Sequence, residues 1–316
     1  MSSVIGLRVR DRLISTLRGL SRFWLNIALA GRELLRGKGG SGGASDGPQH
    51  VGFKGPARVP SGRRVYAVGD IHGRADLLVR LLEILREDAS RGEYTGRPIL
   101  ICLGDYVDRG FQSREVINIL LSDALSSFET YFLKGNHEEA LLQFLSDPSI
   151  GPRWGQFGGV ETLVSYGVRP PRIRNSMEDW SRAARELKMV MPSEHLHFLS
   201  RLDLTVRLGD YLFVHAGVRP GVPLDQQSES DLLWIREEFL ASTKPLEAVI
   251  VHGHSPVSAP HQDTRRIGVD TAAYVSGRLT AARFEDDRVD FIATAPTIQR
   301  ATELGAVVRA REEIRR

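Results

Sequence analysis

The chain has 316 residues, of which 41% are hydrophobic and 26% charged, and these values are typical of a folded globular protein. They exclude a wholly disordered chain and a collagen-like one. The 42 Lys and Arg residues barely exceed the 39 Asp and Glu residues, so the net charge of +3 does not by itself indicate a nucleic-acid partner. The only cysteine, Cys102, excludes an internal disulfide and any zinc cluster built on cysteines, and its apolar neighbours predict a buried strand residue.

Residues 1–36 differ from the rest and predict a basic amphipathic leader. The first 40 residues hold eight Lys and Arg residues against two acidic ones, a net charge of +6. Apolar residues from Leu13 to Ile27 recur at helical spacing, with arginines on the opposite face. No apolar run approaches the ~20 residues that span a bilayer, and no cleavage site of the secretory type follows. We expect this leader to contact an anionic membrane surface or a partner protein.

A linker and an alternating α/β pattern follow the leader. Residues 37–62 are rich in Gly, Ser and Pro, which predicts a flexible linker. From residue 63 onward, short apolar runs alternate with amphipathic segments, and this alternation is typical of a layered α/β fold with parallel strands. The expected strands are 64–68, 98–103 and 129–133, and the expected helices are 76–87, 114–125 and one beginning at 138–145.

The second half of the chain is expected to be rich in strands. A mainly helical insertion is predicted over about 148–197, and one further helix over 230–240. We therefore expect one catalytic domain over 63–295, followed by a charged tail over 296–316. The expected short strands are 204–207, 211–214, 248–251, 266–269, 279–284 and 289–292.

Five of the expected strands end in short motifs that combine glycine with potential metal ligands. In an open α/β sheet, ligands bind beyond the carboxyl ends of the strands, and glycine permits tight turns there. Each motif alone is weak evidence for a metal site, but five of them after five apolar strands are strong evidence. The motifs are Gly69–Gly73 (GDIHG), Gly104–Gly110 (GDYVDRG), Gly135–Glu138 (GNHE), Val214–Gly217 (VHAG) and Val251–Pro256 (VHGHSP).

The potential ligands in these motifs offer oxygen and nitrogen but no thiolate. Such a set suits two divalent ions such as Mn, Fe or Zn. A carboxylate can bridge two ions, and Asp105 follows the middle strand, so it is the natural bridge. A pair of ions at that spacing can clamp the attacking and leaving oxygens of a displacement at phosphorus. The six candidate ligands are Asp70, His72, Asp105, Asn136, His215 and His254.

The motifs GDIHG, GDYVDRG, GNHE, HAG and GHSP resemble the signatures of the calcineurin-like metallophosphoesterases. More narrowly, they resemble the phosphoprotein phosphatase branch, including bacterial and bacteriophage Ser/Thr protein phosphatases. The resemblance extends from about residue 65 to about residue 284. Agreement outside the motifs includes Trp154 with Gly158 and Gly159, the segment Leu233–Arg236, and the segment Val269–Ala272.

This resemblance implies a layered β-sandwich flanked by helices and a centre with two metal ions, for which we favour manganese and keep iron and zinc open. Asp70 and His72 would bind the first ion, and Asp105 would bridge to the second. The hydroxide between the ions would attack phosphorus in line with the leaving group. The ligands implied for the second ion are Asn136, His215 and His254.

The resemblance also implies roles for four catalytic residues. Arg109 and Arg236 match the arginines that clamp phosphate, which a planar fork of donors can bind in bidentate fashion. His137 matches the general acid that protonates the leaving oxygen. Asp108 matches the carboxylate that orients this histidine and raises its pKa. His252 has no role in the motif, and we expect it to pack beneath the site.

Several substrates and one non-catalytic function are compatible with these residues. The Trp234–Arg236 pattern favours a protein Ser/Thr phosphatase acting on phosphoproteins, and a dinucleoside polyphosphate hydrolase of the Ap4A type is the alternative. A non-catalytic adaptor recruited to membranes is the alternative of another class. We expect a cytoplasmic protein without a nucleic-acid partner, which the leader could hold at the inner face of the membrane.

Overall fold

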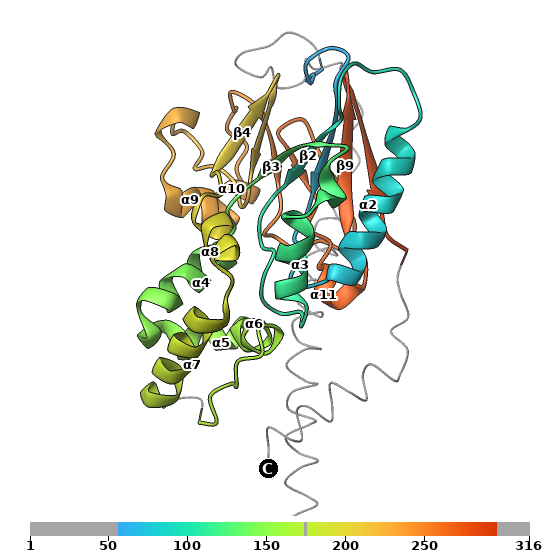
Figure 1. The fold of residues 1–316 in the computed structure, drawn as a ribbon. Helices are drawn as coiled ribbons and strands as arrows, with labels where there is room; N and C mark the ends of the chain where they lie inside the picture. The colour runs from blue at the N-terminus through green and yellow to red at the C-terminus, as the bar shows by residue number, and fades with distance from the viewer. Residues whose placement is uncertain (1–55, 174–175, 296–316) are drawn as a thin grey trace, which may run out of the picture. The chain divides into compact units, whose positions relative to one another are not determined.

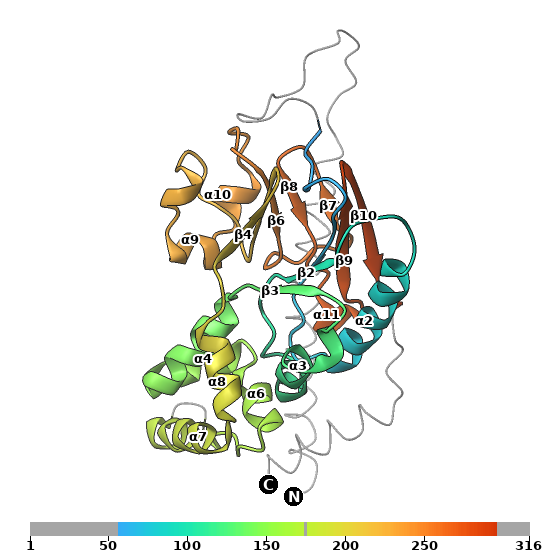
Figure 2. The same cartoon turned by 45° about the horizontal axis from the view of Figure 1, so that its top comes forward.

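The computed structural model describes residues 56–173 and 176–295. The predicted leader, most of the linker and the charged tail lie outside these residues. Two five-stranded mixed sheets pack face to face, and helices cover the outer face of each, so the fold has four layers (Figures 1 and 2). Across the described residues, no helix is both long and apolar enough to cross a membrane.

The first sheet has the strand order β10-β9-β1-β2-β3. Its three parallel strands are the first three that the sequence predicted. β9 pairs with β1 in antiparallel fashion, and β10 pairs with β9 in the same way. β3 is therefore an edge strand. The bounds are β1 (Arg64–Val68), β2 (Ile99–Cys102), β3 (Glu129–Phe132), β9 (Thr280–Glu285) and β10 (Arg288–Ala293).

The second sheet has the strand order β4-β5-β6-β8-β7. β5, β6 and β8 run parallel, so their carboxyl ends lie at one edge of the sheet. The two-residue strand β7 was not predicted, because it is too short to show an alternating pattern. The bounds are β4 (Thr205–Leu208), β5 (Tyr211–Val214), β6 (Val249–His252), β7 (His261–Gln262) and β8 (Arg266–Gly268).

Alternate residues of β1 face two different cores, as the period of a strand requires. Val65 and Ala67 lie in the core between the sheets, where the Phe284 ring is 5.5 Å from Phe213 between centroids. Tyr66 and Val68 face the other way, toward α2 (Ala75–Ala89) and α3 (Ser113–Leu120). Burial on both faces explains why β1 and β2 read as continuous apolar runs.

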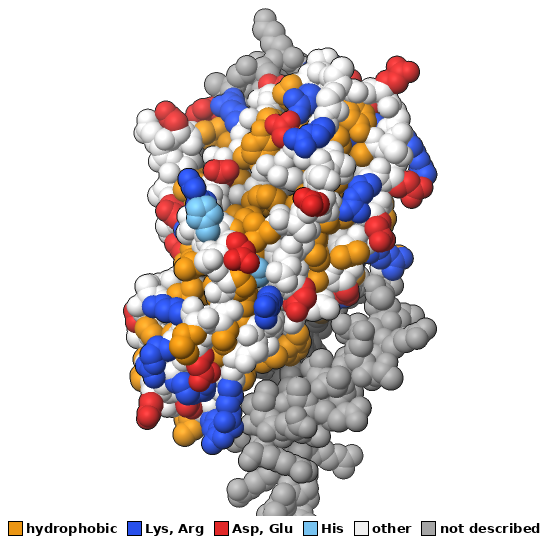
Figure 3. Space-filling model, in the orientation of Figure 1, with side chains coloured by type: hydrophobic (Ala, Val, Ile, Leu, Met, Phe, Trp, Pro, Cys, Tyr) orange, Lys and Arg blue, Asp and Glu red, His pale blue; other side chains and the backbone are white. Residues whose placement is uncertain are grey.

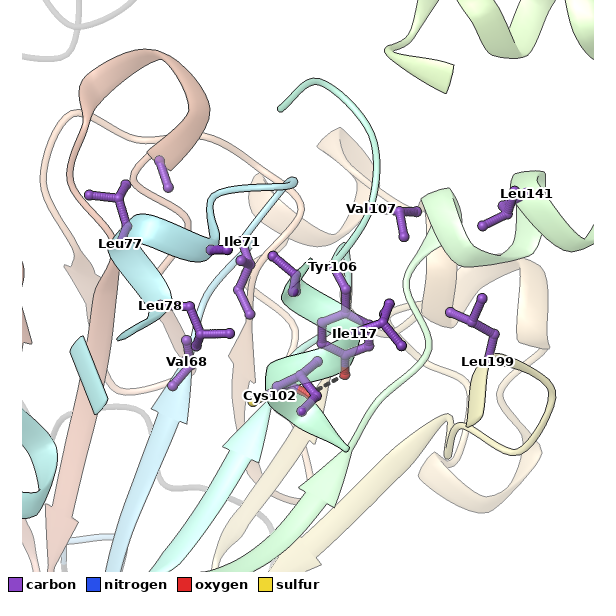
Figure 4. Packing of buried hydrophobic residues seen from close by; sticks show 14 of the residues in the cluster. Val68, Ile71, Leu77, Leu78, Cys102, Tyr106, Val107, Ile117, Leu141 and Leu199 are labelled. Atoms are coloured by element: carbon purple, nitrogen blue, oxygen red, sulfur yellow. Dashed lines mark hydrogen bonds between the residues drawn. The ribbon is translucent and has the colours of Figure 1, made fainter. Parts of the chain in front are cut away.

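The helix-facing core continues beneath the motif loops (Figure 4). Tyr106, from the second motif, lies beside Ile117, and its hydroxyl donates to the Cys102 carbonyl at 3.1 Å. As predicted, Cys102 is a buried strand residue. The loop that carries the second motif is therefore anchored in the core on one side.

Residues 148–197 are mainly helical, as predicted, and pack on α4 (Asn136–Ser146). In the view of Figure 1 this group lies below the second sheet. Its helices are α5 (Gly151–Gln156), α6 (Gly159–Ser165), α7 (Met177–Val190) and α8 (Ser193–Ser200). Figure 3 shows acidic and basic side chains interspersed on this side of the molecule, with apolar atoms exposed between them.

The helix predicted over 230–240 is in fact two short helices that cover the second sheet. α9 (Glu229–Trp234) and α10 (Glu237–Leu240) are separated by Ile235, whose backbone is extended and whose side chain is buried. The predicted helix over 114–125 also ends early, at Leu120. Ser122 then caps a new 3₁₀ turn by accepting the Ala124 N–H, which competes with continuation of the α-helix.

Candidate metal centre

The five motifs meet beyond the carboxyl ends of β1, β2, β3, β5 and β6, and all six predicted ligands are buried there. Several residues in the motifs adopt positive φ, which is costly for residues other than glycine and is characteristic of functional sites. The surrounding loops must hold this strained backbone in place. The residues are His72, Asp105, Asp108, Arg109 and His254, with φ between 47° and 70°.

Asp105 lies between two groups of potential ligands. Its Oδ2 is 3.4 Å from His72 Nε2 and 3.8 Å from His137 Nε2. Its Oδ1 is 3.4 Å from His215 Nε2, and His254 completes this second group. The two carboxylate oxygens therefore face different groups, an arrangement that is compatible with a bridging ligand.

The hydrogen bonds leave imidazole lone pairs directed into this space. The Nδ1–H of His72 donates to the Val107 carbonyl at 2.9 Å, and its buried Nε2 has no hydrogen-bond partner. His215 Nδ1 donates to the Leu103 carbonyl, so its Nε2 lone pair faces Asn136 Oδ1 at 2.9 Å. A cation at this point could bind both the His215 nitrogen and the Asn136 oxygen. The donor set thus fits a divalent cation.

His254 extends the same pattern. Its Nδ1 lies 2.9 Å from Asn136 Oδ1, and its buried Nε2 has no partner. Burial, with His215 and Arg236 nearby, lowers the pKa of His254 to about 2. Burial likewise lowers the pKa of His72 and of His215. These imidazoles are therefore neutral at physiological pH, which is the form that binds metal.

Asp70 lies at the edge of the two groups. Both of its oxygens accept the His254 backbone N–H at 3.1 Å. Its pKa is raised well above the ordinary value by burial, and by the carboxylates of Asp270 and Asp105. Burial also raises the pKa of Asp270, to about 6. Such a set of buried carboxylates stores repulsion that a bound cation relieves.

Asp270 was not predicted to belong to the site, although it lies just beyond a buried strand. Val269 stands between it and Gly268, the last residue of β8, so Asp270 lacks the Gly-Asp or Gly-Asn pair that marks the first three motifs. Its side chain accepts the Ala272 N–H at 2.8 Å.

Asp108 and His137 form a buried pair beside the ligands. Asp108 Oδ2 lies 2.7 Å from His137 Nδ1 and also accepts the Trp154 indole N–H at 2.9 Å. Thr162 donates to the other oxygen at 2.6 Å. Burial alone would lower the pKa of His137, but the Asp105 and Asp108 carboxylates outweigh it and the pKa is raised. Asp108 thus contacts the histidine that the sequence predicted as a general acid.

The two predicted arginines approach from different elements. The Arg109 guanidinium lies 3.2 Å from His137 Nε2 and stacks on the Tyr274 ring at 4.7 Å from its centroid. Arg236 is exposed in the break between α9 and α10. Its positive charge helps to lower the pKa of His215 and of His254. Both cations therefore lie beside the candidate metal centre.

Glu138 is a second residue whose contribution was not predicted. Its carboxylate is fully buried and accepts the backbone N–H groups of Gly135, Asp105, Tyr106 and Val107, thereby tying the GNHE loop to the GDYVDRG loop. Burial, and the charge of Asp105, raise its pKa to about 7. The spacing of three residues after Gly135 is that of a helix-capping glutamate, which is the signal that identifies it.

His252 packs beneath the site, as predicted. It is buried against Phe239, with ring centroids 5.2 Å apart, and its Nδ1 lies 2.9 Å from the Gly253 carbonyl. Burial lowers its pKa to about 3.

Comparison with known proteins identifies the family. The sequence profile of the family "Calcineurin-like phosphoesterase" matches residues 63–295. The protein named "Bis(5'-nucleosyl)-tetraphosphatase PrpE [asymmetrical]" from Halalkalibacterium halodurans is 27% identical over 243 residues, which cover 71% of this chain and 91% of the relative. Its namesake from Bacillus thuringiensis is 28% identical over 236 residues, with coverages of 69% and 89%.

Solved structures show a similar fold. The structure of a "putative diadenosine tetraphosphatase" superposes with a TM-score of 0.52 and 21% identity, covering 76% of this chain and all of that one. The metallophosphoesterase fold expected from the motifs is thus confirmed. Because the family profile covers most of the chain, the protein is a member of the calcineurin-like phosphoesterase family.

Proposed function

We propose that this chain hydrolyses phosphoanhydrides of the dinucleoside tetraphosphate type with the help of two divalent cations. The observation that carries this proposal is the pair of buried side-chain groups that share Asp105, one of which includes His137, the partner of Asp108. Family membership supports metal-dependent phosphoester hydrolysis in general. The names of the relatives, which match over about nine-tenths of their own length, support the dinucleotide substrate.

The ligand groups would hold the cations. Asp70 and His72 would bind one ion, Asn136, His215 and His254 the other, and Asp105 both. Cations at these positions would supply Lewis acidity toward a phosphoryl group.

The remaining residues would bind phosphate and supply a proton. Arg109 and Arg236 would bind phosphoryl oxygens with their fixed forks of donors. His137, kept protonated by Asp108, would hold a proton at Nε2 for the leaving oxygen. Water enters and the phosphoanhydride P–O bond breaks, so that a dinucleoside tetraphosphate cleaved off centre yields a nucleoside monophosphate and a nucleoside triphosphate.

Hydrolysis of phosphoproteins is the second candidate. The Trp234–Arg236 pattern favours it, because it resembles that of bacterial protein phosphatases. A comparison of substrates decides between the two. We expect kcat/KM on diadenosine tetraphosphate to exceed that on phosphoserine peptides by ~10²-fold, a difference of ~2.7 kcal/mol in transition-state binding. A higher kcat/KM on the peptides would reverse the assignment.

The general reaction is tested with para-nitrophenyl phosphate. The full chain with Mn²⁺ should hydrolyse this ester, and Asp105→Asn should abolish the activity. Asp225→Asn is the matched control, because Asp225 is an exposed carboxylate in the 3₁₀ helix η3 (Leu224–Gln226). A wild-type chain that stays inert with Mn, Fe, Ni and Zn would contradict the catalytic proposal and favour the non-catalytic adaptor.

A further inference from the structure

The indole of Trp234 is held in a fixed position at the rim of the metal centre. Trp234 is the last residue of α9, and 42% of its surface is exposed. Its Nε1–H donates to the Glu139 carboxylate at 2.6 Å. Glu139 lies in the first turn of α4, the helix that begins with Asn136 and His137. The helix that contributes these site residues therefore also orients the indole.

The ring borders the second ligand group. Its centroid is 6.4 Å from that of His254, with the two planes nearly perpendicular at 82°. Two residues further along the chain, Arg236 supplies one of the candidate phosphate-binding cations. Trp234 and Arg236 are both exposed on either side of the buried Ile235, so a phosphate held by Arg236 would lie near an aromatic surface that solvent reaches.

Tyr274 is a second aromatic residue next to the centre, but other side chains of the site already contact its ring. Its ring carries the Arg109 guanidinium and lies 5.4 Å from the His72 ring. Phe157 is exposed as well, but no hydrogen bond can fix a phenylalanine ring, and this one lies beside Gly158, whose carbonyl binds the Arg109 backbone. Trp234 therefore combines exposure with a locked orientation.

We propose that Trp234 is a stacking platform for a nucleobase of the substrate, with the attached phosphate on Arg236. This inference rests on the proposed dinucleotide function and deepens it, because it assigns the residue that selects a nucleoside-bearing substrate. Every nucleobase has a π-face that can stack on an indole. An indole that is already locked by Glu139 loses little freedom when a base stacks on it.

Calorimetric titration of the full chain in Mn²⁺ tests the platform without any need for turnover. The probes are AMP, which carries a base, and inorganic phosphate, which does not. Trp234→Leu should raise the Kd of AMP about 10-fold and leave the Kd of phosphate unchanged. Trp234→Phe should retain most of the AMP affinity, since it keeps a stacking ring. Phe157→Leu, the matched loss of an exposed aromatic ring, should change neither value.

Three results would overturn the platform. Equal weakening of AMP and phosphate by Trp234→Leu would indicate a general effect on the centre. An unchanged Kd for AMP would show that no base stacks there, and an AMP effect confined to Phe157→Leu would place the platform elsewhere. Failure of the proposed function is a separate result, because it appears as absent hydrolysis of diadenosine tetraphosphate by the wild-type chain, whatever the binding constants.

Discussion

Asp108 Oδ2 lies 2.7 Å from His137 Nδ1 inside the protein. Because Asp108 helps to raise the pKa of His137, Asp108→Asn should lower that pKa. The acid form is lost as pH rises through the pKa, so the alkaline limb of the kcat profile should move to lower pH. We expect kcat near pH 8 to fall roughly 10–100-fold. Steady-state kinetics from pH 5 to 9 measure both effects.

The shape of that profile separates a role in proton transfer from a structural role. Asp108 also binds Trp154 and Thr162, so a damaged fold would lower kcat equally at every pH. A uniform loss without movement of the alkaline limb would contradict the assignment. Thr162→Val serves as the control, because it removes one partner of Asp108 but leaves its charge in place.

Burial lowers the pKa of His252 to about 3, so this residue makes the free energy of unfolding depend on pH. The unfolded chain binds a proton near the ordinary pKa of ~6.5, so stability is full above that value and is lost as pH falls toward 3. Between pH 6.5 and pH 5, protonation of His252 in the unfolded chain lowers the free energy of unfolding by ~2 kcal/mol. His252→Gln should remove that part of the loss. Urea unfolding at both pH values measures it, with the exposed His197→Gln as control. Parallel pH dependence in wild type and His252→Gln would contradict the prediction.

Individual residues of the site differ in how well the sequence predicted them. The six ligand candidates each follow an apolar strand in a glycine-containing motif, and the structure brings all six together at the sheet edge. Glu138 and Asp270 were missed because their contributions depend on tertiary neighbours. Glu138 contacts backbone N–H groups some 30 residues away, and Asp270 matters because it lies beside Asp70.

At the level of elements, the helical insertion supports the second motif loop through a glycine as well as through Trp154 and Thr162. Gly158, at the start of α6, has φ +112°, and its carbonyl accepts the Arg109 N–H. A Cβ at this position would lie 2.3 Å from the Arg109 backbone nitrogen. Gly158→Ala should therefore lower the unfolding free energy by more than ~2 kcal/mol and impair phosphate binding.

A second glycine provides the matched control for this prediction. Gly167 also has positive φ, at +75°, but an added Cβ there meets no atom within 4 Å. Gly167→Ala should cost only the conformational strain of about 1 kcal/mol and leave activity intact. Thermal unfolding and phosphate inhibition of both variants decide the matter. Equal effects from the two substitutions would show that the contact with Arg109 is unimportant.

The break between α9 and α10 shows where pattern reasoning fails for elements. The spacing of Leu232, Leu233, Phe239 and Leu240 agrees with one helix. Leu232, Phe239 and Leu240 pack in the core cluster of the second sheet, and Leu233 is buried as well. The sequence does not show that Ile235 must be extended to reach the core. That extension turns the backbone at Arg236, where φ is −132° and ψ −99°. Tertiary packing thus overrides local helix propensity.

At the scale of the whole molecule, bound cations should stabilise the fold. Asp70, Asp105 and Asp270 share one buried region, and metal that binds only the folded chain shifts the unfolding equilibrium. Mn²⁺ at 1,000 times its Kd should add ~4 kcal/mol, and EDTA should reverse this gain. Thermal unfolding with and without Mn²⁺ measures it. Asp105→Asn should lose most of the stabilisation by Mn²⁺, and the control Asp225→Asn should lose none. A wild-type unfolding midpoint that does not change with Mn, Fe or Zn would contradict a metal centre.

The charge of the whole chain is divided unevenly between the leading segment (residues 1–64) and residues 65–316. Residues 1–64 carry a net charge of +9, whereas the remaining residues carry −6. The high pI of about 9.1 therefore describes the leading segment, and the residues that hold the candidate centre are on balance acidic. A basic amphipathic segment of this kind is suited to an anionic surface, whose attraction weakens with salt.

Deleting residues 1–48 tests this assignment, since no residue of the candidate centre precedes Asp70. The full chain should sediment with vesicles that contain phosphatidylserine, and less so in 0.5 M salt, while the shortened chain should stay in the supernatant. Vesicles of phosphatidylcholine alone are the control. Hydrolysis of para-nitrophenyl phosphate should be the same for both chains. Equal sedimentation of the two would exclude the leader as the membrane contact, and lost hydrolysis would show that the leader also serves the catalytic domain.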